Sequence, residues 1–74
     1  MTYNKLINKL PAHSELHYLS DADSEYQSSE HNYILFSYTT DMPETIAALK
    51  QHNIDYTIKT DSFDLDYILI NYTK

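Results

Sequence analysis

The sequence predicts a small α+β protein in which a four-stranded, mostly antiparallel sheet carries one or two helices, in the order αββαββ. Apolar residues recur at helical spacing in two stretches, and they alternate or run together in the stretches between them. Consecutive strands with no helix between them favour antiparallel pairing. We expect one domain, residues 1–74, which at this size buries only about 60% of its unfolded surface.

Residues 2–10 and the segment after Asp41 predict the helices. In the first, Leu6 and Leu10 recur on one face, and Pro11 disfavours helical geometry at the residue before it. In the second, Asp41 is a good N-cap and Pro43 suits the first turn. Glu44 complements the helix dipole in the first turn, and Met42, Ile46 and Leu49 form the apolar stripe. Asn53 is the expected left-handed residue after the C-terminus of the helix.

The predicted strands are residues 15–20, 31–38, 54–60 and 64–72. The first also fits a helix, because Leu16 and Leu19 are three residues apart, but the segment is short and we prefer a strand. The second is apolar on both sides, which predicts a central position or a second face covered by a partner. In the third, Ile54, Tyr56 and Ile58 are expected to face inward.

The last predicted strand is acidic at its start and apolar, and so expected to be buried, along the rest of its length. Asp61, Asp64 and Asp66 precede or begin it, and Leu65 to Tyr72 is the longest apolar run. Residues 20–30 hold four acids, four serines and one large side chain, Tyr26. This composition favours turns, so we interpret the segment as a solvated mobile loop or as an acidic finger that meets a basic partner.

The charge is strongly acidic, since 11 Asp and Glu face five Lys, for a formal net charge of −6. Such a surface repels nucleic acid and membrane headgroups and attracts basic proteins. Neither a signal-peptide core nor a run of about 20 apolar residues is present, which predicts a cytosolic protein. The small size, the two-sided strand and the eight tyrosines predict a homodimer, because tyrosine suits half-buried interfaces.

The residue pattern gives little support to an enzyme, a metal site or a cofactor site. Asp64 and Asp66 are the best acid–base pair, but no nucleophile or phosphate-binding glycine loop accompanies them. His13 and His17 have helical metal spacing without a third ligand. The segment from Asp21 begins like a calcium loop but has Tyr26 where glycine is required. We therefore expect a protein without catalytic residues, metal or cofactor.

The spacing of the acids indicates a different role. Carboxylates two residues apart on an extended chain recur about every 6.6 Å, a regular array of negative charge that loosely imitates a row of DNA phosphates. Asp21, Asp23 and Glu25 form one such row, and Asp64 and Asp66 form another. A two-fold dimer would double both rows into a symmetric pattern.

In size, acidity and tyrosine content, the chain resembles small acidic phage proteins that mimic DNA, in particular the staphylococcal-phage inhibitors of the bacterial DNA polymerase sliding clamp. The resemblance implies a homodimer that acts in the host cytoplasm and occupies the clamp's DNA channel. The acids that would replace phosphates are Asp21, Asp23, Glu25, Glu30, Asp61, Asp64 and Asp66. Alternatives are another basic DNA-binding target, as for an anti-CRISPR or anti-restriction mimic, or a regulatory dimer without mimicry.

A second feature points to the same target. The segment from Gln51 to Tyr56 resembles the hexapeptide with which partners enter the clamp's surface pocket, with Ile54 and Tyr56 replacing the usual Leu and Phe. These positions are also expected to be needed for packing at the end of a helix and the start of a strand. We therefore expect the acids, and not this segment, to bind.

Overall fold

The computed structural model describes residues 2–12, 14–37 and 41–73. Its elements are α1 (Thr2–Ile7), β1 (Leu16–Tyr18), the 3-10 turns η1 (Leu19–Asp21) and η2 (Ser24–Tyr26), β2 (Tyr33–Phe36), α2 (Met42–Gln51), β3 (Asp55–Thr60) and β4 (Asp66–Asn71). The predicted α+β class and the αββαββ order are confirmed, with two 3-10 turns added between the first two strands.

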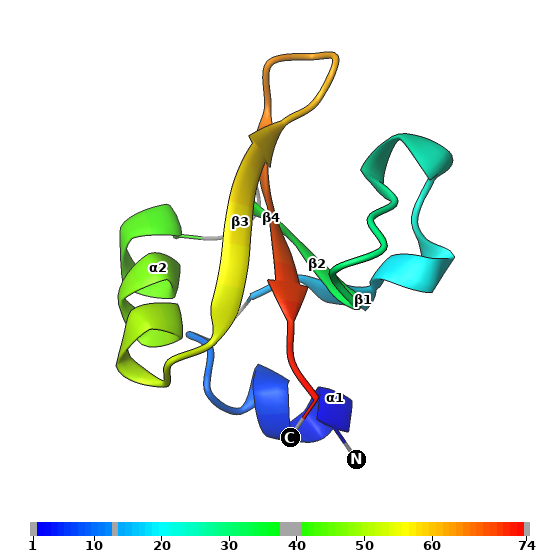
Figure 1. The fold of residues 1–74 in the computed structure, drawn as a ribbon. Coiled ribbons are helices and arrows are strands. Elements are labelled where there is room, and N and C mark those ends of the chain that lie inside the picture. The colour runs from blue at the N-terminus through cyan, green and yellow to red at the C-terminus, as the bar shows by residue number, and fades with distance from the viewer. Residues whose placement is uncertain (1, 13, 38–40, 74) are drawn as a thin grey trace.

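The four strands form one sheet in the order β1-β2-β4-β3, and every neighbouring pair is antiparallel. The strand β2 is central, as its two-sided apolar pattern predicts, and its neighbour β4 is the other central strand. The turn between β3 and β4 lies at the opposite end of the molecule from both chain termini (Figure 1).

The two helices close one face of this sheet. Leu6 of α1 and Leu49 of α2 are fully buried there against Leu35 and Ile68 of the central strands. Helix α1 is also bonded to the edge strand β1, because the Tyr3 hydroxyl donates a hydrogen bond to the Leu16 carbonyl at 2.8 Å. The first helix, too short to be stable alone, is therefore held by its packing.

The opposite face is closed by the segment that carries η1 and η2. Leu19 is buried there with Ile34, Tyr67 and Leu69, and Tyr26 packs against this group. Figure 1 shows α2 on one side of the sheet and the two 3-10 turns on the other. The segment of residues 20–30 is therefore held on the sheet through Ala22 and Tyr26, although most of its side chains are exposed, and it covers the second face of β2. Of the two alternatives predicted for this strand, a central position or a face covered by a partner, the structure shows the central position.

Several predicted boundaries shift. The first helix ends at Ile7 and the last strand begins at Asp66, while the end of the second predicted strand, Tyr38, lies outside the described residues. Asn53 has the expected left-handed backbone, with φ 54°. Asp41 is the N-cap of α2, but among the described residues its side chain caps no backbone N–H.

The inward face predicted for the third strand is only partly correct. Ile54 is buried and Tyr56 is partly buried against the helix-covered core, whereas Ile58 is 42% exposed. The strand β3 is an edge of the sheet, and the helix-covered core ends at Tyr56 along it. An alternating pattern identifies the face of a side chain, but it does not show how far the covering helices reach.

Candidate binding surface

The turn from Asp61 to Leu65 joins β3 to β4 and is held by the carboxylate at its start. Asp61 Oδ1 accepts hydrogen bonds from the backbone N–H groups of Phe63 at 2.9 Å and Leu65 at 3.0 Å. Two backbone hydrogen bonds also hold the turn: the Asp61 N–H donates to the Leu65 carbonyl at 3.0 Å, and the Asp64 N–H donates to the Asp61 carbonyl at 3.1 Å. This is the local side-chain-to-backbone bonding that makes Asp a turn residue.

The two acids after Asp61 have different environments from those predicted. Asp64 was expected to share a strand face with Asp66, but it lies in the turn with a left-handed backbone, φ 62°. Asp66 begins β4, and its carboxylate accepts a hydrogen bond from the Thr60 hydroxyl at 2.9 Å. The predicted row of Asp64 and Asp66 along one strand is therefore wrong, because the chain reverses direction before Asp66.

The turn also exposes apolar side chains. Phe63 is 77% exposed and Leu65 is 42% exposed, so the predicted buried run from Leu65 to Tyr72 begins two residues later, at Tyr67. An aromatic side chain at the tip of a turn gains almost no burial within the chain. Single exposed apolar side chains are common on protein surfaces, but these two are two residues apart in one turn that also carries acids.

The second acidic segment is folded into turns. Asp21 ends η1, Asp23 is the residue before η2 and Glu25 lies within η2, so the predicted extended row of these three acids is wrong in its backbone geometry. All three side chains are exposed. The Gln27 side-chain amide fixes the segment by donating hydrogen bonds to the Leu19 carbonyl at 2.8 Å and the Ala22 carbonyl at 2.9 Å.

Tyr26 brings the two acidic segments together. Its ring meets those of Tyr67 and Phe36 edge to face, with centroids 4.9 Å and 5.5 Å apart. Its hydroxyl donates to Asp61 Oδ2 at 3.4 Å, across 35 residues of chain. Burial raises the pKa of the Tyr67 phenol above its ordinary value, and the carboxylates of Glu25 and Asp61 raise this pKa further. Both carboxylates therefore act on one phenol.

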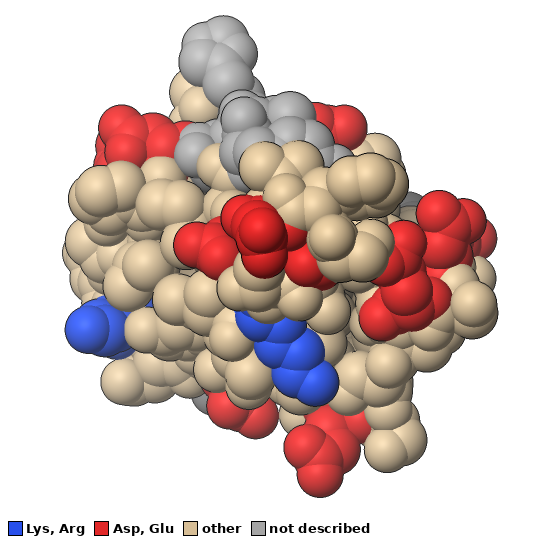
Figure 2. Space-filling view, turned by 90° about the horizontal axis from the view of Figure 1, so that it is seen from above, with Lys and Arg blue, Asp and Glu red and all other residues tan. Residues whose placement is uncertain are grey.

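We call the carboxylates of these two segments the acidic surface: Asp21, Asp23, Glu25, Asp61, Asp64 and Asp66. Figure 2 views the molecule from the side on which the β3–β4 turn projects, and acidic groups lie at its centre and right edge as well as at its upper left, upper right and lower edge. Lysine side chains also appear on this face (Figure 2). Of the predicted acids, Glu30 is placed differently: it is exposed and precedes the start of β2, where Tyr33 pairs with Ile70, away from the β3–β4 turn.

Sequence reasoning identified the acids but not their meeting point. The available signal was Tyr26, the one large side chain in residues 20–30, together with the two-sided apolar pattern of β2. A single aromatic residue in a polar segment needs an apolar surface to pack on, and an uncovered sheet face needs a segment to cover it. The exposure of Phe63 has no signal in the sequence, because an aromatic residue between Asp61 and Asp64 fits a buried strand position as well as a turn.

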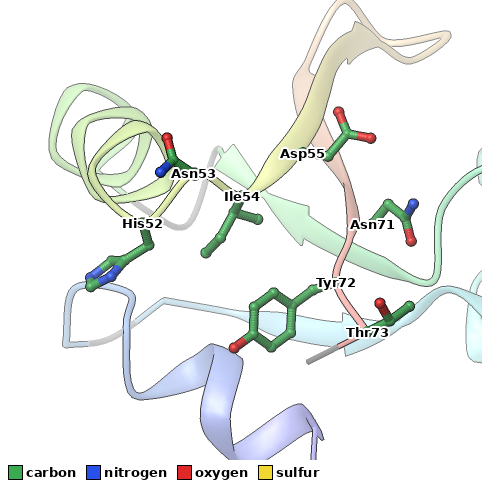
Figure 3. Close-up of a pocket in the computed structure, with 7 residues that line it drawn as sticks. All are labelled: His52, Asn53, Ile54, Asp55, Asn71, Tyr72 and Thr73. Carbon is green, nitrogen blue, oxygen red and sulfur yellow. The ribbon is translucent and has the colours of Figure 1, made fainter.

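The segment from Gln51 to Tyr56 lies away from this turn. Ile54 is 6% exposed, Tyr56 packs on the helix-covered core and Gln51 ends α2 with an exposed side chain. A shallow cavity of about 110 Å³ adjoins the segment, lined by His52, Asn53, Ile54, Asp55, Asn71, Tyr72 and Thr73. Figure 3 shows Ile54 and Tyr72 directed into the interior between α2, α1 and the sheet. As expected, the side chains of Ile54 and Tyr56 are used in packing the core.

Among the described residues, no group of three or more His, Asp or Glu side chains could hold a metal ion. His13 lies outside these residues, and His17 Nε2 is 3.2 Å from Glu15 Oε1 at the surface. In the same part of the chain, no helix is long and apolar enough to cross a bilayer. No family model, curated protein or solved structure matches the chain.

Proposed function

We propose that this protein is a non-enzymatic phage inhibitor of host DNA replication. It binds the DNA polymerase sliding clamp in the host cytoplasm as a homodimer and occupies the clamp's DNA channel, with its carboxylates in place of DNA phosphates. The proposal combines the resemblance in size, charge and composition with the acidic surface. Any other basic DNA-handling protein would offer the same attraction, so the target must be tested directly.

The observation that best supports the proposal is the contact between Tyr26 and Asp61. It joins two acidic segments that are far apart in sequence into one surface, on a protein of formal net charge −6. Most of these carboxylates are exposed and available to a basic partner, whereas Asp61 is partly buried and bonded to its own turn. Asp61 therefore positions the surface, and its exposed neighbours make the contacts.

The test is binding of the purified protein to a purified bacterial sliding clamp. The informative variant replaces Asp21, Asp23 and Glu25 by Asn, Asn and Gln. Exposed charge pairs are each worth about 0.2–1 kcal/mol, so three replacements should weaken binding by about tenfold. Wild-type binding should also fall steeply with salt, because exposed charges are screened over about 8 Å at physiological ionic strength.

A matched control replaces three exposed acids outside the surface, Asp41, Glu44 and Asp55, in the same way. Each variant removes three of the same charges, taking the formal net charge from −6 to −3. If both variants bind more weakly than the wild-type protein and by the same factor, net charge and not the acidic surface attracts the clamp. Duplex DNA should compete with the protein, whereas competition by a polymerase-tail peptide alone, with loss of binding in Gln51→Ala, would place the contact at residues 51–56.

A further inference from the structure

The β3–β4 turn presents Phe63 in a way that its own fold does not explain. Within the part of the chain that the structure describes, Phe63 at 77% exposed is far more accessible than the next large apolar side chains, Ile58 and Leu65 at 42% each. Transfer of an exposed aromatic ring out of water is favourable, and here most of that gain is not used in folding. It is available for binding.

The backbone beneath Phe63 is fixed before any partner arrives. Its N–H is bonded to Asp61 Oδ1 at 2.9 Å, and the same oxygen accepts the Leu65 N–H at 3.0 Å. Below the turn, the Thr60 hydroxyl joins the Asp66 carboxylate across the two strands. A loop already held in its bound shape loses less conformational entropy on association, so this turn suits an anchoring role.

The charges around Phe63 define the partner. Asp61, Asp64 and Asp66 lie within three residues of it, and Asp64 and Asp66 are exposed. An apolar side chain with polar groups around it matches the apolar core and polar rim of protein interfaces. The complementary surface is an apolar pocket bordered by Lys or Arg.

We infer that Phe63 is the apolar anchor of the acidic surface and enters such a pocket on the basic partner, while Asp64 and Asp66 meet the cations at its rim. This inference rests on the proposed function. It adds that the contact is not carboxylate-to-cation alone. A second copy of this chain fits less well, because two-fold pairing of the turn would bring like carboxylates together.

The experiment measures binding to the purified sliding clamp at low and at physiological salt. Phe63→Ser should weaken binding by about 30-fold, the effect of losing a hot-spot side chain, and by a similar factor at both salt concentrations, because apolar burial is not screened. Asp64→Asn should have a smaller effect that diminishes as salt rises. Ile58→Thr is the matched control, since it shortens another exposed apolar side chain of the hairpin and should leave binding unchanged.

Thermal unfolding separates binding from folding, and Phe63→Ser should unfold at the wild-type temperature because the side chain is exposed. If the wild-type protein binds the clamp and Phe63→Ser binds equally well, or if Ile58→Thr weakens binding as much, the anchor is wrong while the proposed function remains. If the wild-type protein does not bind the clamp, both are wrong. If Phe63→Ser converts a dimer to a monomer in sedimentation, Phe63 belongs to a self-interface and the inference is overturned.

Discussion

The two faces of the sheet bury similar side chains but are covered by different kinds of secondary structure. Helices α1 and α2 cover one face, and their amphipathic spacing is visible in the sequence. Two 3-10 turns cover the other, through Leu19 and Tyr26 in a segment whose composition is that of a surface loop. A helix brings its own backbone hydrogen bonds to the core. A turn segment depends on a few side chains to stay in place, and half of the acidic surface, Asp21, Asp23 and Glu25, lies on that segment.

The largest expected effects test this difference with one substitution on each face. Leu35→Ala and Leu69→Ala each remove a leucine that is at most 1% exposed, from adjacent central strands. Both should destabilise the fold within the range of about 2–5 kcal/mol for such cavities. We expect Leu35 near the top of this range and Leu69 near the bottom, because a turn segment can collapse into a cavity more easily than two packed helices can.

Denaturant unfolding of the two variants gives the comparison directly. Ile46→Val, a small reduction of a partly buried side chain on α2, provides a reference for a mild change. Equal losses for Leu35→Ala and Leu69→Ala would show that η1 and η2 are held as firmly as the helices, and the distinction between the faces would have no energetic meaning.

This contrast also explains how much the sequence could reveal. The helix-covered face follows from local rules: Asp41 and Pro43 start α2, Asn53 ends it, and alternation orients Ile54 and Tyr56. The turn-covered face depends on contacts between distant residues, such as Tyr26 with Tyr67 and Asp61. Tyr26 in a polar segment is a local signal that this segment packs on something, but no local pattern identifies the residues that it contacts, so the individual acids could be named but not the surface that they form.

A smaller effect is expected at Asp61, where the turn-covered face meets the β3–β4 turn. Asp61→Ala removes the acceptor of two backbone N–H groups and of the Tyr26 hydroxyl, and it should cost about 0.5–1.5 kcal/mol. Asp61→Asn keeps a carbonyl oxygen that can accept the same backbone bonds, and it should retain most of the stability. Denaturant unfolding of both variants measures the difference.

Asp64→Asn is the control for this pair, since it also removes a carboxylate from the turn while Asn tolerates the left-handed backbone at this position. It should be as stable as the wild-type protein. If Asp61→Asn is as destabilised as Asp61→Ala, the charge of Asp61 holds the turn, and its role as a hydrogen-bond acceptor is secondary.

The smallest effects are expected from tyrosine hydroxyls, and they are confined to alkaline pH. The phenol of Tyr33, on the helix-covered face, has a pKa raised by burial and then by neighbouring Tyr18 and Tyr72. The pKa of Tyr67 is raised by burial and then by the Glu25 and Asp61 carboxylates. In both cases the folded state favours the neutral phenol, so the contribution to stability is complete below the unfolded pKa of about 10 and is lost as pH rises through the folded pKa.

Tyr33→Phe and Tyr67→Phe should therefore behave like the wild-type protein at neutral pH and lose less stability above about pH 10. The two faces should differ in their response to Glu25→Gln. This substitution removes one of the carboxylates that act on Tyr67 and neither of the groups that act on Tyr33, so it should reduce the advantage of Tyr67→Phe and leave that of Tyr33→Phe unchanged. Denaturant unfolding between neutral and alkaline pH, with phenolate absorbance, measures both. If Glu25→Gln leaves the advantage of Tyr67→Phe unchanged, Glu25 does not reach Tyr67 in solution, and the packing of its segment against Tyr67 would then be wrong.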